Sequence, residues 1–263
     1  MNMTVMIENS TISDTFAAEH GLSLLLETGG QSILFDTGQS GAFADNAKKL
    51  NVDLSRVDFV VLSHGHFDHG GGLSRFLALN QKANIFMSVH AFEGHYHGEN
   101  KYIGLDPALK DCGRIIYIEN DCTLAPGISI HTCKDYPLLY PIDSSGLCVK
   151  SGNQFFPEQF NHEQYLLLED AGKRILISGC SHRGILNIMS WFQPDILIGG
   201  FHFMSIDVDD AGKARLKHAA DFLLKYPTRY YTGHCTGLPQ FDYMKSIMGD
   251  RLHAIPTGTV LKL

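Results

Sequence analysis

The chain has 263 residues, of which 44% are hydrophobic and 19% charged, enough apolar material to bury the core of one large domain or two modest ones. Its formal net charge of -7 and the lack of any lysine or arginine cluster argue against nucleic acid and a membrane surface as partners. No apolar stretch approaches the roughly 20 residues of a membrane-spanning helix. The amino-terminal residues lack an export signal, so we expect a cytoplasmic protein whose six cysteines are mostly reduced.

The first third of the chain alternates apolar strands with short helices. Runs rich in valine and leucine predict strands, at residues 3–8, 22–28, 29–38 (a strand between two turns), 57–63 and 83–90. Helical spacing of apolar residues predicts helices at 40–51, with Ser40 as a capping residue, and at 71–81.

The middle of the chain, roughly residues 91–160, has little periodicity. Strands are predicted at 114–119 and 127–132, and the rest is rich in loops. Because long loops in compact domains are often functional, one interpretation is a lid or insertion across one face of the protein. The alternative is a loosely patterned part of the core, and the sequence leaves this choice open.

The last third is regular again. Residues 163–179 predict a hairpin that turns at "DAGK". Helices and strands then alternate, with helices at 184–192, 209–226 and 237–249 and strands at 195–201, 228–233 and 254–263. Two sheets packed face to face with helices outside would satisfy this pattern.

The most informative segment is "SHGHFDH", residues 63–69, directly behind an apolar run. His64, His66, Asp68 and His69 place four potential metal ligands in six positions. Imidazole nitrogen and carboxylate oxygen are the groups that bind Zn²⁺ or Fe²⁺. Two pairs of ligands indicate two neighbouring metals, and an ordinary polar turn is the alternative.

Several motifs together resemble one protein family. "HGHFDHGGGL" is similar to the H-x-H-x-D-H signature of the metallo-β-lactamase superfamily, and "SILFDTG" resembles its strand that ends in Asp36. "IENST", "AEHGLSLLLET", "ISGCSHRGILNI", "GGFHF" and "TGHCTG" resemble a subgroup of metal-dependent hydrolases similar to dihydropterin ribofuranosylaminobenzene-phosphate synthase-like proteins. The resemblance implies a single α/β domain over residues 1–263. Its expected fold is an αβ/βα four-layer sandwich of two mixed sheets with helices on the outer faces.

The resemblance also implies the remaining ligands. His162, before the predicted hairpin, matches the third histidine of the first metal, and His234 matches the late histidine of the second. Cys180 stands where most of the superfamily has a bridging aspartate. A metal can bind and deprotonate a thiol, but nearby His182 competes as a ligand or contacts the substrate instead.

Other polar residues are expected to support the ligands or contact the substrate. These are His202 after a predicted strand, His20 in "AEHG", and Asp36. The pair His95 and His97 in "GHYHG" has no strand in front and no acid behind, so we expect an ordinary feature of the lid.

The expected function is that of a metal-dependent hydrolase with a dinuclear centre and a metal-bound hydroxide. The cofactors are two divalent metal ions, with zinc favoured and iron or manganese as alternatives. Asp68 would hold the water and relay a proton. The only expected partner is a small-molecule substrate of the ester, lactone or phosphodiester type, a class that includes molecules bearing a pterin or a phosphate. A non-catalytic, metal-stabilised ligand-sensing protein is the alternative, and a di-iron redox protein is disfavoured because His66 stands where that class has glutamate.

Overall fold

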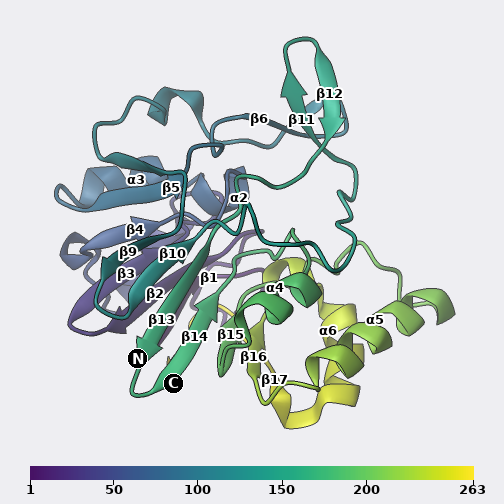
Figure 1. Cartoon of the computed structure of the whole chain (residues 1–263). Helices are drawn as coiled ribbons and strands as arrows, with labels where there is room; N and C mark the ends of the chain where they lie inside the picture. The colour runs from purple at the N-terminus through teal and green to yellow at the C-terminus, as the bar shows by residue number, and fades with distance from the viewer.

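Two sheets of seven strands each lie face to face at the centre of the protein (Figure 1). The computed structural model describes residues 1–263. In spatial order, the first sheet consists of β18 (Val260–Lys262), β1 (Asn2–Ile7), β2 (Ser23–Thr28), β3 (Gln31–Phe35), β4 (Phe59–Val61), β5 (Asn84–Ser88) and β8 (Ile115–Ile118). The second consists of β17 (Leu252–Ala254), β16 (Arg229–Thr232), β15 (Ile196–Ile198), β14 (Lys173–Ile177), β13 (Tyr165–Asp170), β10 (Ile128–His131) and β9 (Cys122–Ala125).

Each sheet contains a block of parallel strands. In the first sheet β3, β4, β5 and β8 pair in parallel, and in the second β14, β15, β16 and β17 do so. The other pairs are antiparallel, so both sheets are mixed, as expected. The carboxyl ends of parallel strands meet at one edge of a sheet, which is where α/β proteins usually bind ligands.

Period-two alternation in the strands builds three separate apolar layers. Leu24 and Leu26 of β2 face the other large sheet, whereas Leu25 faces the opposite side, towards the helices. In β13 the same alternation sends Leu166 and Leu168 inward and Leu167 outward. These strands are therefore apolar on both faces because both faces are covered.

The helices cover the outer faces of the two sheets. They are α1 (Ala42–Lys49), α2 (Phe67–Gly70), α3 (Leu73–Leu79), α4 (Ile185–Phe192), α5 (Asp210–Leu223) and α6 (Leu238–Met248), with single 3₁₀ turns η1 (Leu54–Arg56), η2 (Pro107–Leu109), η3 (His234–Thr236) and η4 (Gly249–Arg251). Residues of α1 and α3 pack on the first sheet, and residues of α4, α5 and α6 pack on the second. The expected four-layer sandwich is confirmed. None of the helices has the length and apolar character needed to cross a membrane.

A small third sheet projects beyond one end of the sandwich (Figure 1). Its order is β12 (Gln154–Pro157), β11 (Leu147–Ser151), β6 (Gly94–His97) and β7 (Lys101–Tyr102). Within the stretch 91–160, β8, β9 and β10 belong to the large sheets. The stretch interpreted as either a lid or a part of the core therefore contributes strands to all three sheets, and its two ends form the projecting sheet.

The predicted start of the first helix differs slightly from the structure. α1 begins after Gly41, and Ser40 is one residue too early to be its capping residue. The Ser40 hydroxyl nevertheless accepts a hydrogen bond from the Ala42 N–H at 3.1 Å, which satisfies one of the free donors at the helix start.

Candidate metal centre

The candidate site lies at the edge where the parallel strands of both sheets end. The loop after β4 carries His64 and His66, and the short helix α2 that follows it carries Asp68 and His69. Asp36 directly follows β3. Cys180 and His182 follow β14. His202 follows β15, and His234 follows β16. Residues that are far apart in the sequence therefore meet because each follows a strand with the same direction.

One group of ligand atoms belongs to His64, His66 and His182, whose ring nitrogens lie within 4.8 Å of one another. All three side chains are buried. The Nε2 atoms of His64 and His182 are 3.3 Å apart. The Ser63 hydroxyl donates its single proton to the Asp36 carboxylate, so it accepts a hydrogen bond from Nδ1 of His64 at 2.8 Å. The proton of the neutral His64 ring is therefore on Nδ1, and Nε2 keeps its lone pair.

A second group consists of Asp68, His69 and His234. His69 Nε2 lies 3.2 Å from His234 Nε2, and Oδ2 of Asp68 lies 3.3 Å from His234 Nε2 and 3.7 Å from His69 Nε2. Ligands at the Zn–N distance of about 2.0–2.1 Å in a tetrahedral site are roughly 3.3–3.4 Å from one another. The spacing of these three atoms therefore fits a metal ion.

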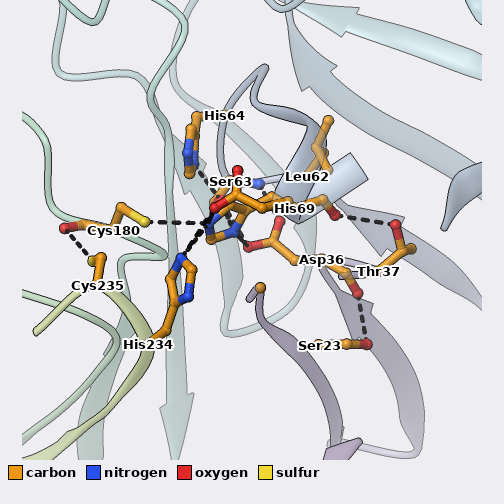
Figure 2. Close-up of polar contacts among 12 residues, drawn as sticks. Ser23, Asp36, Thr37, Leu62, Ser63, His64, His69, Cys180, His234 and Cys235 are labelled. Carbon is orange, nitrogen blue, oxygen red and sulfur yellow. Dashed lines mark hydrogen bonds and ion pairs between the residues drawn. The ribbon is translucent and has the colours of Figure 1, made fainter. Parts of the chain in front are cut away.

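Hydrogen bonds behind the second group fix the tautomers of its rings. Nδ1 of His69 donates to the Asp36 carboxylate at 2.6 Å (Figure 2), and Nδ1 of His234 donates to the Asn9 side-chain oxygen at 2.9 Å. Both Nε2 atoms then carry lone pairs and face the Asp68 carboxylate. With His69 neutral, three acceptors converge without a donor between them, and a cation, either a second proton on His69 or a metal ion, would balance them.

The electrostatics of the site agree with this requirement. Burial lowers the pKa of His64, His182 and His234, and it lowers that of His66 to about 3, so these rings are in the neutral form that binds metals. His69 is the exception. Burial lowers its pKa, but the Asp36 carboxylate and then Asp68 outweigh burial and raise the pKa of His69 to about 9. The carboxylates thus attract either a second proton on His69 or a metal ion.

Cys180 lies between the two groups. Its Sγ is 3.1 Å from His69 Nε2 and also within 4.8 Å of a His64 ring nitrogen (Figure 2). Burial raises the pKa of the Cys180 thiol well above its usual range, so it stays protonated unless a cation is bound. The neighbouring Cys235 thiol donates to the Cys180 carbonyl at 3.4 Å. All six cysteines are free thiols.

The structure places His162 beside His66, in a buried group with His95 and Glu158 whose ligand-type atoms lie within 4.8 Å of one another. Nδ1 of His162 accepts the Gly65 N–H at 2.7 Å, so the proton of the neutral ring sits on Nε2, which faces Glu158 at 3.9 Å. This Nε2 atom would have to lose its proton before it could bind a metal ion. The His182 ring, and not the His162 ring, has a nitrogen beside Nε2 of His64.

His95 also differs from the expectation of an ordinary lid residue. Its ring is fully buried, stacks on His162 with 4.0 Å between ring centroids, and places Nδ1 2.9 Å from the Glu158 carboxylate. Nε2 of His66 lies beside this group, buried and without a hydrogen-bond partner. The group of His95, Glu158 and His162 therefore backs one of the candidate ligands. No spacing in the sequence indicated Glu158.

Two further buried carboxylates were not recognised in the sequence. Glu163 accepts the backbone N–H groups of His182 at 2.6 Å and Arg183 at 2.9 Å, and Glu8 accepts the backbone N–H of His234. Both hold the loops that carry candidate ligands. Their only sequence signal is an acidic residue beside an apolar strand, which is too common to be specific.

A cavity of about 320 Å³, here named the metal pocket, opens onto both groups. Its wall includes Asp68 and His182 from the metal groups, and His97 and Lys101 from the small sheet. A larger hollow of about 980 Å³ lies around the β2–β3 turn and is lined by no histidine or cysteine. The chemistry is therefore concentrated in the smaller cavity.

His20 and His202 also line the metal pocket, and His20 forms a group with Asp68 and His234 whose ligand-type atoms lie within 4.8 Å of one another. Asn9 donates to Nδ1 of His20 at 3.4 Å, and Nε2 of His20 then faces Oδ2 of Asp68 at 3.3 Å. The His202 ring lies 4.2 Å from that of His182, and its backbone has a left-handed φ of 55°. Such a conformation in a residue with a Cβ is uncommon and concentrates at functional sites.

The fold and the paired ligand groups define a known class of protein. Residues 18–234 match the sequence profile of the metallo-beta-lactamase superfamily, and the chain belongs to this superfamily. Its relatives include metal-dependent hydrolases.

Individual relatives are similar over nearly the whole chain. The 7,8-dihydropterin-6-methyl-4-(beta-D-ribofuranosyl)-aminobenzene-5'-phosphate synthase of Methanocaldococcus jannaschii is 28% identical over 275 residues, covering 94% of this chain and 91% of that protein. The uncharacterized protein MJ0448 of the same organism is 29% identical over 245 residues, covering 89% and 91%. The crystal structure of Tm1679, a metal-dependent hydrolase of the beta-lactamase superfamily, superposes with a TM-score of 0.83 at 27% identity, covering 100% and 99%.

Proposed function

We propose that this protein is a metal-dependent hydrolase with two divalent metal ions, zinc in the first instance. His64, His66 and His182 would hold one ion, and Asp68, His69 and His234 the other, with Cys180 between them. The observation that carries the proposal is the convergence of His69 Nε2, His234 Nε2 and Asp68 Oδ2 at 3.2–3.7 Å, a spacing that fits ligands of one metal ion. His182 thus replaces His162 as the proposed third ligand.

Two such ions polarise the bond to be broken and lower the pKa of water, which is the chemistry of hydrolysis. The side chains of the pocket supply the remaining tasks. Asp68 Oδ2 faces both His20 and His234 and can orient the attacking water. The His20 side chain is half-exposed at the mouth of the pocket, and its Nε2–H can donate a hydrogen bond to a leaving group.

The proposed substrate is a small ester, lactone or phosphodiester, with a phosphate-bearing molecule favoured. The metal pocket has the size of a small-molecule site, and Lys101 and His97 provide donors for an anion opposite the metal groups. The name of the relative from M. jannaschii contains a pterin and a phosphate, which supports the same class of substrate. The charge of -7 argues against nucleic acid.

Elemental analysis and turnover test the proposal. We expect two metal ions per chain and hydrolysis of bis(p-nitrophenyl) phosphate or of a member of an ester and lactone panel. A chelator should abolish turnover and zinc should restore it. Asp68→Asn should lower kcat by about 10²–10⁴-fold. One tightly held metal with no turnover on any substrate would instead support the ligand-sensing alternative.

A further inference from the structure

A second cavity of about 480 Å³ adjoins the metal pocket. The two cavities share Ser145, His182, His202 and Ser205 in their walls. His182 is a proposed metal ligand, so this second cavity, here named the side pocket, begins directly beside the first metal group. One ligand can therefore occupy both cavities.

The wall of the side pocket is largely apolar. Ile185 and Leu186 of α4, Phe201 and Phe203 of the loop after β15, and Ala214 of α5 line it. Nothing in the proposed hydrolytic chemistry uses this surface. Apolar surface beside a polar reaction centre is typical of a site that binds the non-reacting part of a ligand.

The charged side chains of the side pocket include an exposed pair. Asp143 and Arg215 both line this pocket, and their exposed side chains form an ion pair of 3.7 Å. This pair joins the loop before β11 to α5 across the rim. An exposed ion pair contributes little stability, so a ligand can displace it readily.

The loop wall of the side pocket is held in place before any ligand binds. The side chain of Asn187, which is fully buried in α4, accepts the backbone N–H groups of Leu139 and Tyr140 at 2.9 and 2.8 Å and donates to the Tyr140 carbonyl at 2.9 Å. Tyr140 itself lines the pocket. A preformed wall reduces the ordering cost of binding.

We propose that the side pocket binds a flat aromatic or heteroaromatic arm of the substrate, while the anionic, hydrolysable group lies at the metal groups. This inference rests on the proposed function and specifies its substrate class as an aryl-bearing phosphate-type ester. His202 stands at the junction, where its left-handed backbone holds the ring between the two cavities. Arg215 and Tyr140 can contact polar substituents at the outer edge of the arm.

Binding of two phosphonates to the metal-loaded protein tests this inference. Phenylphosphonate and methylphosphonate share the anionic group and differ only in the arm. We expect calorimetry to show that phenylphosphonate binds about 10- to 50-fold more tightly, as burial of one aromatic ring predicts.

Two substitutions in α5 test whether the side pocket causes the preference for phenylphosphonate. Ala214 is exposed and lines the side pocket, so Ala214→Trp fills the cavity without disturbing the core. It should remove the phenyl preference and leave methylphosphonate binding unchanged. Lys217→Trp adds the same bulk to an exposed position outside the wall and should preserve the preference.

The outcomes separate the inference from the proposed function. No phenyl preference, including no detectable binding of phenylphosphonate, would overturn the inference. A preference that survives in Ala214→Trp would overturn it as well. Metal content and turnover of small esters test the hydrolase proposal independently of this inference, because neither measurement requires a substrate with an aromatic arm.

Discussion

The Nε2 atoms of His64 and His182 lie 3.3 Å apart, although 118 positions separate these residues in the chain. One belongs to the loop after β4 of the first sheet, and the other to the loop after β14 of the second. This contact distinguishes His182 from His162, whose Nδ1 is already occupied by the Gly65 N–H.

His182→Ala should therefore remove one metal ion per chain, as measured by elemental analysis of the purified protein. His162→Ala should leave the metal count at two. Its effect should be on stability, because the buried Gly65 N–H would lose its acceptor at a cost of about 1–3 kcal/mol. Loss of a metal in His162→Ala, with two retained in His182→Ala, would reverse the assignment.

Asp36→Asn should weaken the second metal site by about 10- to 100-fold in affinity, because the carboxylate that orients His69 and attracts positive charge is lost. Asparagine tolerates the left-handed backbone of residue 36, where φ is 58°, so the fold should persist. Competition with a chromophoric chelator measures the affinity. Asp45→Asn, on the exposed side of α1, is the matched control and should behave like the wild type.

Substitutions of Cys180 should show whether its position between the groups matters. Cys180→Asp restores the acid that most of the superfamily has there and should keep two metals and turnover. Cys180→Ala removes the donor and should lower the affinity for at least one ion by about tenfold or more. Equal metal content and turnover in all three proteins would show that Cys180 is not a ligand.

The outer core of the second sheet should carry a large share of the stability. Leu197 of β15 is fully buried among residues of β13, α4 and α5, so Leu197→Ala should lower the free energy of unfolding by about 2–5 kcal/mol. Leu238, which is 69% exposed, provides the control, and Leu238→Ala should change stability by less than about 0.5 kcal/mol. Urea denaturation of the metal-free proteins makes the comparison without a contribution from bound ions.

The periodicity of the sequence was sufficient to predict most strands of the large sheets and the helices beside them. It did not indicate β9, and it predicted one strand over 254–263 where the structure has the separate strands β17 and β18. Four candidate ligands could be predicted as a cluster because they lie within six positions of one another. The choice between His162 and His182 could not be made in the same way. His162 precedes β13 and His182 follows β14, and an antiparallel hairpin brings both of these ends to the same edge of the sheet.

Which ring then faces His64 depends on a backbone contact, the bond from Gly65 to His162. The group of His95, Glu158 and His162 beside His66 could not be predicted from the sequence for a similar reason. His95 lies in β6, and Glu158 directly follows β12. They meet only because both strands pair with β11. No local pattern contains that pairing.

Each candidate metal group takes side chains from both large sheets. His64 and His66 come from the first sheet and His182 from the second, and Asp68 and His69 are combined in the same way with His234. An ion bound to either group therefore acts as a cross-link between the two halves of the sandwich. During folding, neither half alone can assemble a complete coordination shell, so tight metal uptake has to follow the docking of one sheet on the other.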